Sequence, residues 1–274
     1  MNYKRLLTFQ DISCVGQCSL TVALPVLSVC GIETCVLPSM VLSTHTGGFK
    51  DITKADLTDY LSGYLNSWRS NNISFDVIYT GYLGNLKQIE IVKRLKDEFL
   101  NPGGLLIVDP VMGDDGELYS GFDDKYVDEV RKLCEIADII IPNLTEACLL
   151  ARKSHTEQFS NDVLTELLEN LAKLGPRTVV LTGISETPEY AGATIYENGK
   201  IHFAKAVKQP GSFACTGDLF ASVFTGPLIR TGDVNKAADR AAEFVSETIA
   251  ETIKNPGPGY GIRFEGLLGK LLEN

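Results

Sequence analysis

The sequence predicts an α/β fold with a mostly parallel central sheet and helices packed on both of its faces, a three-layer arrangement. Short apolar, β-branched runs alternate along the chain with longer amphipathic stretches. Such alternation is typical of strand–helix–strand units, which build parallel sheets. The 274 residues contain no linker-like stretch, low-complexity tract or fixed repeat. A single domain over residues 1–274 is therefore expected.

Three strand–helix pairs are expected in the first half of the chain. The first helix tolerates Pro25 and ends at Gly31, because glycine readily adopts the left-handed conformation that closes many helices. The second helix carries Leu57, Leu61 and Leu65 at intervals of four residues, which places them on one face. The strands span 5–9, 33–43 and 75–82, and the helices span 19–31, 53–70 and 85–100.

The second half of the chain continues the alternation and ends in two helices. Its short apolar strands are each bounded by polar or glycine residues. Asn198-Gly199 is typical of a two-residue hairpin turn, and it divides residues 192–207 into two antiparallel strands. The other strands span 104–110, 138–143 and 177–183, and the helices span 124–137, 145–151, 161–174, 217–229 and 233–254.

The charge balance of the chain limits its partners. With 25 basic and 35 acidic residues, the formal net charge is −10. Nucleic acids and anionic membranes are bound mainly through Lys and Arg, so neither is an expected partner. No run of about 18 apolar residues occurs, and the N-terminus has no long apolar segment. We expect a cytoplasmic protein.

Cysteine and histidine usage points away from structural cross-links. There are seven cysteines, an odd number, and no Cys-x-x-Cys. Free thiols in a reducing compartment are therefore expected. The three histidines are scattered along the chain, so a structural zinc site is not expected.

Polar and glycine residues follow each expected strand of the parallel sheet. Ligands of such sheets bind at the carboxyl ends of the strands, which lie along one edge. We therefore expect one composite site at that edge. Its stations are Gln10 and Asp11, residues 43–48 (STHTGG), Thr80 to Tyr82, residues 109–116 (DPVMGDDG), residues 142–147 (PNLTEA), and Thr182 with Gly183.

The segment ACTGDLF (214–220) stands directly before an apolar helical run. The first backbone N–H groups of a helix lack partners and carry the positive end of its dipole, so they bind anions without a lysine. Asp218 would lie in the first turn, beside such an anion. The alternative is that Asp218 only offsets the helix dipole, as first-turn acids often do. The segment alone leaves both interpretations open.

Two further motifs place carboxylates at strand ends. Asp109 ends one strand and Glu146 opens the next helix, and such groups can hold Mg²⁺ beside phosphates. Asn143 and Glu146 are also spaced as the two members of a helix capping box, which would give them a purely structural role. The Gly- and Asp-rich stretch 113–122 is either a solvated loop or a lid over the site.

Several common nucleotide and nucleophile motifs are absent. The chain has no P-loop, no G-x-G-x-x-G after the first strand and no G-x-S-x-G elbow. The sequence therefore predicts neither a P-loop enzyme, nor a dinucleotide oxidoreductase, nor a serine hydrolase of the elbow type.

Five segments, in their order along the chain, resemble the ribokinase-like superfamily: STHTGG, TGYLGN, VDPVMGD, IPNLTEA and ACTGDLFAS. Within it they resemble most the pyridoxal/pyridoxamine (vitamin B6) kinases, over about residues 5–250. The resemblance implies ATP-dependent transfer of a phosphoryl group to the 5′-hydroxymethyl group of pyridoxamine, pyridoxal or pyridoxine. It also implies Mg²⁺ and a homodimer, and it leaves a monovalent cation such as K⁺ open.

The resemblance implies a role for each matching residue. Asp218 would be the catalytic base, and an anion hole would come from the backbone of Cys215, Thr216 and Gly217. Further roles follow in the same way: the metal site at Asp109 and Glu146, the ATP site at Asn143, Thr182 and Tyr119 (the last in the lid), and the pocket for the pyridine ring at Asp11, His45, Thr46 and Tyr82.

The chain departs from the family pattern at two positions. Asp11 stands where the family commonly has serine, which favours a cationic substrate and hence pyridoxamine over pyridoxal. Cys215 replaces the first glycine of the family's GTGD segment. A hydroxymethylpyrimidine or phosphomethylpyrimidine kinase, a sugar kinase and a B6-binding protein without catalytic activity are the alternatives. The retained Asp218, Asp109 and Glu146 favour an enzyme, because a binder needs no base.

Overall fold

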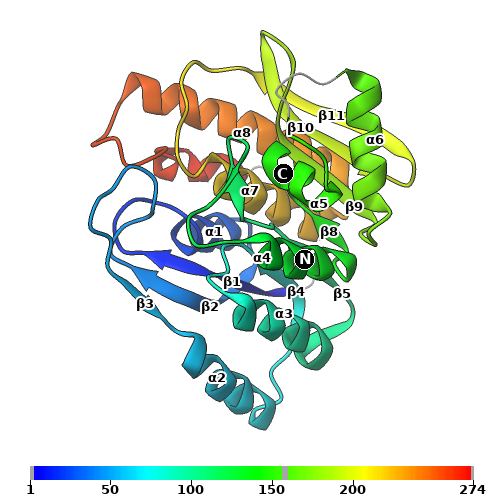
Figure 1. Ribbon diagram of the computed structural model, residues 1–274. Helices are drawn as coiled ribbons and strands as arrows, with labels where there is room; N and C mark the ends of the chain where they lie inside the picture. Colours follow the sequence, from blue (N-terminus) through cyan, green and yellow to red (C-terminus); the bar gives the residue numbers. More distant parts are fainter. Residues whose placement is uncertain (1–2, 156–159, 273–274) are drawn as a thin grey trace.

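A nine-stranded sheet runs through the middle of the computed structural model, which describes residues 3–155 and 160–272 (Figure 1). Neighbouring strands pair in parallel from β9 to β2, and the antiparallel strands β10, β11 and β3 lie outside them. In spatial order the strands are β11 (Lys200–Val207), β10 (Tyr190–Glu197), β9 (Thr178–Thr187), β8 (Ile139–Ile140), β5 (Leu100–Val108), β4 (Phe75–Thr80), β1 (Arg5–Ser13), β2 (Glu33–Leu42) and β3 (Lys54–Asp56). The predicted α/β class is confirmed.

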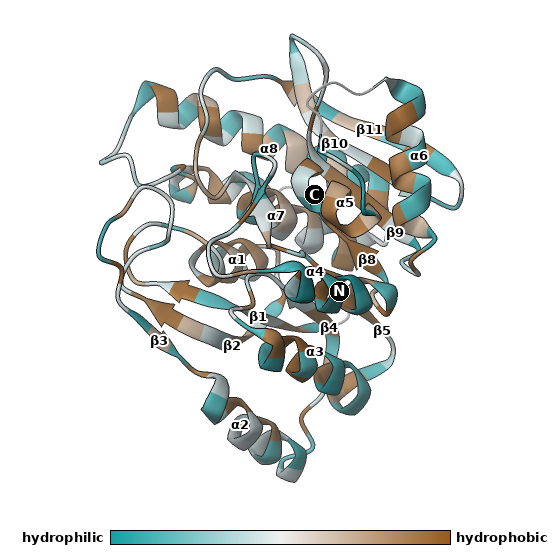
Figure 2. Cartoon of the chain, viewed as in Figure 1, coloured by the Kyte–Doolittle hydropathy of each residue, from teal (hydrophilic) through white to brown (hydrophobic). Residues whose placement is uncertain are grey.

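Helices cover both faces of the sheet. One face packs against α1 (Leu20–Val29), α7 (Thr216–Thr231), α8 (Val234–Lys254) and the 3₁₀ helix η1 (Glu265–Leu271). The other packs against α2 (Thr58–Ser70), α3 (Leu86–Phe99), α4 (Asp124–Glu135), α5 (Leu144–Ala151) and α6 (Asn161–Ala172). Figure 2 shows the apolar strands between these two layers. The structure therefore has the predicted three layers.

The strand sequences explain why two cores form. Successive side chains of a strand point to opposite faces, and in β4 Val77 and Tyr79 join the α1–α7–α8 core whereas Ile78 joins the other. Because both faces are covered, nearly every position of the central strands is apolar, as expected for buried parallel strands. The polar exceptions on one face are Thr8 and Gln10 of β1, and both are fully buried.

Two boundaries differ from the predictions in ways that bear on the site. The first strand was expected to end at residue 9 but runs on to Ser13, with a break in its register to β2 between Gln10 and Ile12. Asp11 lies at this break, and β-bulges re-aim side chains in this way. The region expected as one helix over 53–70 begins instead with β3, an edge strand too short for its period to be recognised.

The two tight turns follow their local sequence. Residues 192–207 form the predicted hairpin, with Asn198 and Gly199 both at positive φ. A second, unpredicted hairpin joins β6 (Gly113–Asp114) to β7 (Glu117–Leu118) within the Gly- and Asp-rich stretch after β5. Its turn residue Gly116 donates its backbone N–H to Thr145 Oγ1 at 2.9 Å, which fixes this hairpin to the start of α5.

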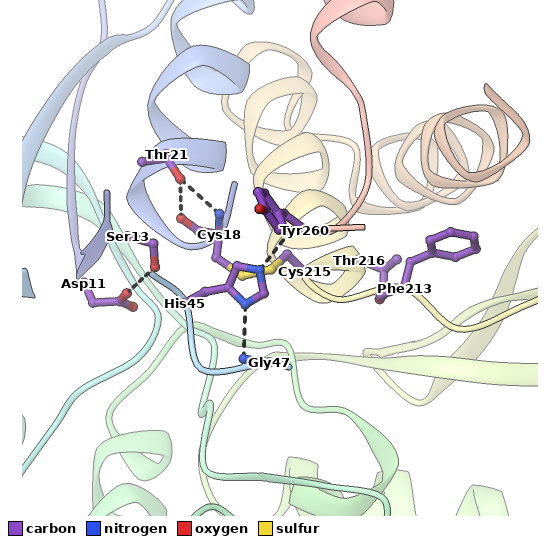
Figure 3. Close-up of a disulfide and its surroundings, with 10 residues drawn as sticks. All are labelled: Asp11, Ser13, Cys18, Thr21, His45, Gly47, Phe213, Cys215, Thr216 and Tyr260. Atoms are coloured by element: carbon purple, nitrogen blue, oxygen red, sulfur yellow. Dashed lines mark hydrogen bonds between the residues drawn. A yellow bond between two sulfur atoms is a disulfide. The ribbon is translucent and has the colours of Figure 1, made fainter. Parts of the chain in front are cut away.

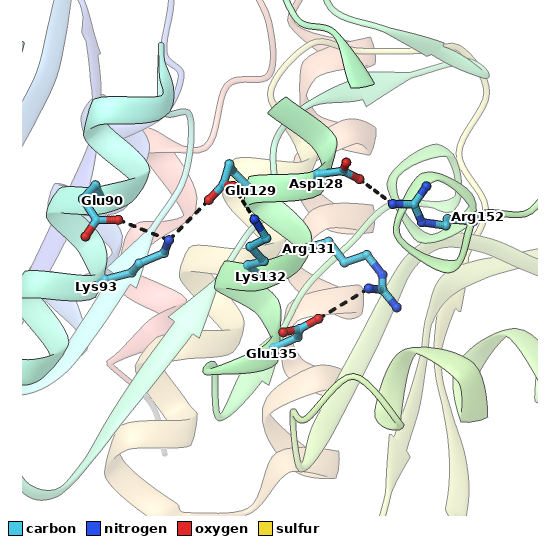
Figure 4. Close-up of polar contacts among 8 residues, drawn as sticks. All are labelled: Glu90, Lys93, Asp128, Glu129, Arg131, Lys132, Glu135 and Arg152. Carbon is cyan, nitrogen blue, oxygen red and sulfur yellow. Dashed lines mark hydrogen bonds and ion pairs between the residues drawn. The ribbon is translucent and has the colours of Figure 1, made fainter. Parts of the chain in front are cut away.

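Ion pairs join the outer helices on one face. Lys93 of α3 reaches Glu129 of α4 at 3.3 Å, and Arg152, next to α5, reaches Asp128 of α4 at 2.6 Å (Figure 4). These side chains are partly exposed, so each pair contributes about 0–1 kcal/mol. These ion pairs help to align α3, α4 and α5, but they contribute little to the stability of the fold. No helix among the described residues is long and apolar enough to cross a membrane.

Candidate active site

The strand ends bring most of the predicted stations to one edge of the sheet. Asp11 follows the middle of β1, Asp109 follows β5, and Asn143 lies between β8 and α5. The Asp109 N–H donates to Thr80 O at 3.1 Å, and the Thr182 N–H donates to Pro142 O at 2.9 Å. These bonds extend the strand pairing past the strand ends, so they hold the neighbouring stations in register.

The start of α5 is closed by a complete capping box. Asn143 Oδ1 accepts the Glu146 N–H at 2.9 Å, and Glu146 Oε2 accepts the Asn143 N–H at 2.9 Å. The other groups are also engaged, because Asn143 Nδ2 donates to Gly113 O at 2.8 Å and Glu146 Oε1 accepts the Met112 N–H at 3.0 Å. The predicted capping box is therefore formed, and both side chains fix the chain after β5.

The start of α7 is built differently. Cys215 is the residue before the helix, and its backbone is left-handed with φ of 68°. Among the residues described, its side chain makes no hydrogen bond to the free N–H groups of the first turn. The N–H groups of Thr216 and Gly217 therefore keep the capacity to bind an anion.

Asp218 lies in the first turn of α7 and is directed away from it. It accepts a hydrogen bond from the backbone N–H of Ser19, which belongs to the segment between β1 and α1. Asp218 is half-buried, and the partial removal of its carboxylate from water raises its pKa to about 7, with the negative charge of Asp11 adding to the rise and the Ser19 N–H opposing it. A carboxylate with a pKa near neutrality is suited to general-base chemistry.

Asp109 and Glu146 are two buried acids that lie near Asp218, the acid in the first turn of α7. Burial raises the pKa of Asp109 well above its usual value, and the charges of Glu146 and Asp218 raise it further. Burial likewise raises the pKa of Glu146 to about 7, although the backbone N–H groups of Asn143, Met112 and Gly113 oppose the rise. Carboxylates that repel one another in this way can bind a proton or a cation between them.

His45 lies at the centre of a cluster of loops. Its Nε2 is 2.8 Å from Tyr260 O, and its Nδ1 accepts the Gly47 N–H at 3.1 Å, which makes Nε2 the donor (Figure 3). Phe49 packs edge-on against His45 and also contacts Tyr260, with ring centroids 4.8 Å apart in each case. His45 is buried, and it lies near enough to Asp11 to be among the groups that affect the pKa of that carboxyl.

Aromatic rings line the site on the side of β4 and the β6–β7 hairpin. Tyr82 is half-buried, and its ring lies 5.7 Å from that of Phe122. Burial and the charge of Asp11 raise the pKa of Tyr82, so this ring also faces the β1 bulge. Burial, and then the charges of Glu146, Asp114, Asp218 and Asp109, raise the pKa of Tyr119. Tyr119 follows β7, is 39% exposed and lies near enough to these acids for their charges to affect its pKa.

Thr182 and Thr46, the remaining predicted residues, are tied less closely to the acids of the site. Thr182 is half-buried beside the start of α5, and its Oγ1 donates to Pro142 O at 3.3 Å. Thr46 is exposed on the loop that follows His45, and no contact of its side chain ties it to the acids. The structure therefore brings Asp11, His45 and Tyr82 close to Asp218, whereas Thr46 lies at the rim.

The prediction of free thiols is wrong at one pair of cysteines. Cys18 and Cys215 are joined by a disulfide, with their Cα atoms 5.3 Å apart and 197 residues between them in the sequence (Figure 3). The other five cysteines form no disulfide, as predicted. Sequence spacing carries no signal for this pair, because only the packing of the segment before α1 on the start of α7 brings the two together.

Sequence reasoning also missed several residues of the site. Ser19 contributes its backbone N–H to Asp218, and Tyr79 is fully buried beside Asp109 and Asp218, whose charges raise its pKa in addition to the effect of burial. Tyr260 comes from a Gly- and Pro-rich segment that has no strand or helix signal. Tyr79 precedes the predicted Thr80–Tyr82 station by one residue, so its place at a strand end was the signal that could have revealed it.

Comparison with known proteins assigns the family. A model described as phosphomethylpyrimidine kinase matches residues 24–262. The crystal structure of pyridoxal kinase from Lactobacillus plantarum has 32% sequence identity, covers 98% of this chain and 96% of its own, and gives a TM-score of 0.90. The chain belongs to the pyridoxal kinase family of the ribokinase-like superfamily. Like other members of this family, it is a phosphotransferase with an alcohol acceptor.

Two further relatives carry the two enzyme names that occur in these comparisons. A candidate phosphomethylpyrimidine kinase from Bacteroides thetaiotaomicron VPI-5482 has 35% identity and a TM-score of 0.94, with 99% of this chain and 94% of that chain covered. A second crystal form of that protein contains pyridoxal. Human pyridoxal kinase is 29% identical over 225 residues, which are 72% of this chain and 68% of its own. Pyridine and pyrimidine kinase names thus occur together among the relatives.

Proposed function

We propose that this protein is an ATP-dependent kinase of vitamin B6 salvage, which phosphorylates the 5′-hydroxymethyl group of pyridoxamine, pyridoxal or pyridoxine. The observation that carries the proposal is the start of α7. There, the N–H groups of the first turn and Asp218, with its pKa of about 7, lie near Asp11, which in turn lies near the ring of Tyr82. The relatives named pyridoxal kinase support the same substrate class.

Asp218 would act as the general base. Its carboxylate accepts the proton of the substrate hydroxyl as that oxygen attacks the γ-phosphorus of ATP. The N–H groups of Cys215, Thr216 and Gly217 form the anion hole, where the positive end of the α7 dipole stabilises the charge on the transferred group. The site therefore needs no lysine to neutralise the phosphoryl group, in keeping with the acidic composition of the chain.

The residues present fit Mg²⁺. Asp109 is 8% exposed, its pKa is raised by neighbouring acids, and the one hydrogen bond that opposes this rise comes from the Val111 N–H. Its carboxylate therefore has oxygen lone pairs left for a hard cation, which would neutralise charge on the phosphates. Glu146 is held by backbone N–H groups on both oxygens, so we assign it the positioning of this loop and a contact to the metal through water. Asn143, Thr182 and Tyr119 would face the nucleotide phosphates.

Asp11 would set the preference among B6 vitamers. Burial raises its pKa, while hydrogen bonds from the Ser19 side chain and from Ser13 Oγ, the latter at 3.4 Å, favour the ionised form. A buried carboxylate is stabilised by a cationic partner, and pyridoxamine carries an ammonium group whereas pyridoxal does not. We therefore expect a higher kcat/KM for pyridoxamine, and Asp11→Ser is expected to remove the difference. Equal values for both vitamers, unchanged in that variant, would contradict this role.

A panel of ring alcohols tests the proposal. The purified protein is incubated with ATP, Mg²⁺ and each of pyridoxamine, pyridoxal, pyridoxine and hydroxymethylpyrimidine, and the phosphorylated product is measured by mass spectrometry. We expect kcat/KM for the best B6 vitamer to exceed that for hydroxymethylpyrimidine at least tenfold. The reverse order would favour the pyrimidine kinase that the family model's description names. Turnover of none of the four would contradict an enzyme of this kind.

The remaining proposals concern the whole protein. We propose that residues 1–274 act as one kinase domain, in the cytoplasm and as a homodimer. Similarity to the pyridoxal kinase structure over 98% of the chain supports one domain, and five of the seven cysteines form no disulfide, as expected in a reducing compartment. Light scattering tests the dimer, and the same assay with K⁺ exchanged for a large organic cation tests a requirement for a monovalent cation.

A further inference from the structure

The disulfide between Cys18 and Cys215 lies within the candidate active site. Both residues are half-buried, and their sulfur atoms and a ring nitrogen of His45 lie within 4.8 Å of one another (Figure 3). A Cβ atom at Gly16 would overlap the His45 ring, so the segment before Cys18 packs directly on that side chain. The disulfide is thus partly accessible to solvent, and it lies next to His45, a residue of the proposed substrate pocket.

The disulfide joins the two segments that meet at Asp218. Cys215 immediately precedes α7, the helix that carries Asp218, and its own N–H belongs to the proposed anion hole. Cys18 is followed by Ser19, whose N–H donates to the Asp218 carboxylate and which forms a bridge with Ile12 of β1. A covalent bond between the cysteines therefore keeps the Ser19 N–H on the same carboxylate that must accept the substrate's proton.

We propose that Cys18 and Cys215 are a redox-active pair that switches this enzyme between an active dithiol form and a less active disulfide form. The effect on activity rests on the kinase function proposed above, whereas formation of the bond does not. Phosphoryl transfer requires the reacting atoms to approach within about 3–3.5 Å. The disulfide form opposes that approach, because it fixes the anion-hole residue Cys215 and holds a competing donor on Asp218.

The position of Cys215 favours exchange with a small disulfide. Helix N-termini stabilise thiolates, and the thiolate is the form that attacks a disulfide. The Cys215 thiolate attacks one sulfur of glutathione disulfide, and the first glutathione leaves as a thiolate. The Cys18 thiolate then attacks the Cys215 sulfur and expels the second glutathione. The two cysteines lose two electrons and two protons in total, and the two released glutathiones gain them.

Cys18, His45 and Cys215 also resemble a metal-binding set in their spacing. The hydrogen bonds of His45 oppose that interpretation. Its Nε2 is engaged by Tyr260 O and its Nδ1 by the Gly47 N–H, so no ring nitrogen is left for a metal unless one of these bonds breaks. The geometry therefore favours a dithiol–disulfide pair next to a structural histidine.

A redox titration with two readouts tests the proposal. The reduced protein is equilibrated in glutathione buffers from fully reduced to fully oxidised, and each sample is divided. One half is blocked with N-ethylmaleimide and analysed by peptide mass spectrometry for the Cys18–Cys215 cross-link. The other half is assayed for kcat/KM with ATP and the best B6 vitamer. We expect the cross-link to form with at least a tenfold loss of kcat/KM, and dithiothreitol to reverse both.

Two cysteine variants assign the effect. Cys18→Ser is expected to keep the reduced activity within twofold and to form no internal cross-link. Without Cys18 to expel it, one glutathione remains bound to Cys215 under oxidising conditions, where the mass measurement detects it and dithiothreitol removes it. Cys14→Ser is the matched control, because Cys14 is an exposed free thiol in the same segment, and it is expected to respond as the wild type does. If Cys18→Ser does not fold, Cys18→Ala replaces it, and the wild-type titration stands by itself.

Three results would overturn the proposal. They are the absence of the cross-link at the oxidising end, a complete cross-link with unchanged kcat/KM, and a loss of activity in oxidised Cys18→Ser protein that carries no glutathione on Cys215. A reduced protein that phosphorylates no B6 vitamer would instead contradict the proposed function. The redox chemistry of the pair would still be decided by the mass measurement, which does not depend on turnover.

Discussion

Two helices begin at the same edge of the sheet, and each has an acid at the third position of its first turn. In α5 that acid is Glu146, which folds back onto the N–H of Asn143 and closes a capping box. In α7 it is Asp218, which takes its backbone hydrogen bond from the distant Ser19. Similar local patterns thus give a closed helix start in one case and an open one in the other.

This difference makes the start of α7, rather than the start of α5, the candidate for binding an anion. In α5 the capping box gives the Glu146 N–H an acceptor, and the Glu146 carboxylate fixes the chain after β5, so α5 supplies rigidity. The first turn of α7 is left without a side-chain cap among the described residues, so its N–H groups can serve an anion. The following predictions test this contrast, beginning with the largest expected effect.

Asp218→Asn is expected to lower kcat by about 10²- to 10⁴-fold, because the amide accepts no proton from the substrate hydroxyl. The measurement is ATP-dependent phosphorylation of pyridoxamine or pyridoxal, with circular dichroism as the check on folding. The control is Asp124→Asn, which changes an exposed acid in the first turn of α4. If both variants retained full activity, Asp218 would only offset the dipole of α7.

The kcat/KM of the wild type is expected to fall about tenfold per pH unit below about 7. The pKa of Asp218 is raised to about 7, so its ionised form, the base, is present above this pH and is lost as the pH falls through it. Asp11→Asn removes the charge that adds to this rise, and we expect the acid limb to move to lower pH. A limb that stays in place in that variant would contradict the coupling of the two acids. The profile is measured from pH 5.5 to 8.5.

Asn143→Ala is expected to lower the free energy of unfolding by about 1–2 kcal/mol, because the N–H of Glu146 loses its acceptor. Urea unfolding measures this change, and Ser160→Ala is the matched control at the start of α6, where the cap is exposed. An effect no larger than that of Ser160→Ala would show that α5 does not depend on its capping box.

Cys215→Gly is expected to have the smallest effect. In reduced protein it should change kcat by no more than a few-fold, since glycine keeps the N–H of the anion hole. It should also relieve about 1 kcal/mol of backbone strain, because the residue has a positive φ. Kinetics and thermal unfolding in dithiothreitol measure both effects. A large loss of kcat would instead assign a role in catalysis to the thiol.

Much of the fold follows from local sequence patterns. The apolar strands, the amphipathic helices and the turn at Asn198-Gly199 are formed as predicted, because each depends on neighbouring residues. The strand ends also located Asp11, Asp109 and Asn143, since parallel strands align their carboxyl ends. The short elements β3, β6 and β7 were missed, because two or three residues do not establish a period.

The sequence by itself determined the α/β class, the family resemblance and the edge of the sheet where the site lies, because periodicity, strand ends and motifs are local properties. Only the tertiary structure decided what each acid does. Glu146 finds its partner within its own helix turn, whereas Asp218 is held by Ser19, and Cys215 is joined to Cys18 across 197 residues. Those contacts depend on how α1 and α7 pack together on one face of the sheet, and no local pattern encodes that packing.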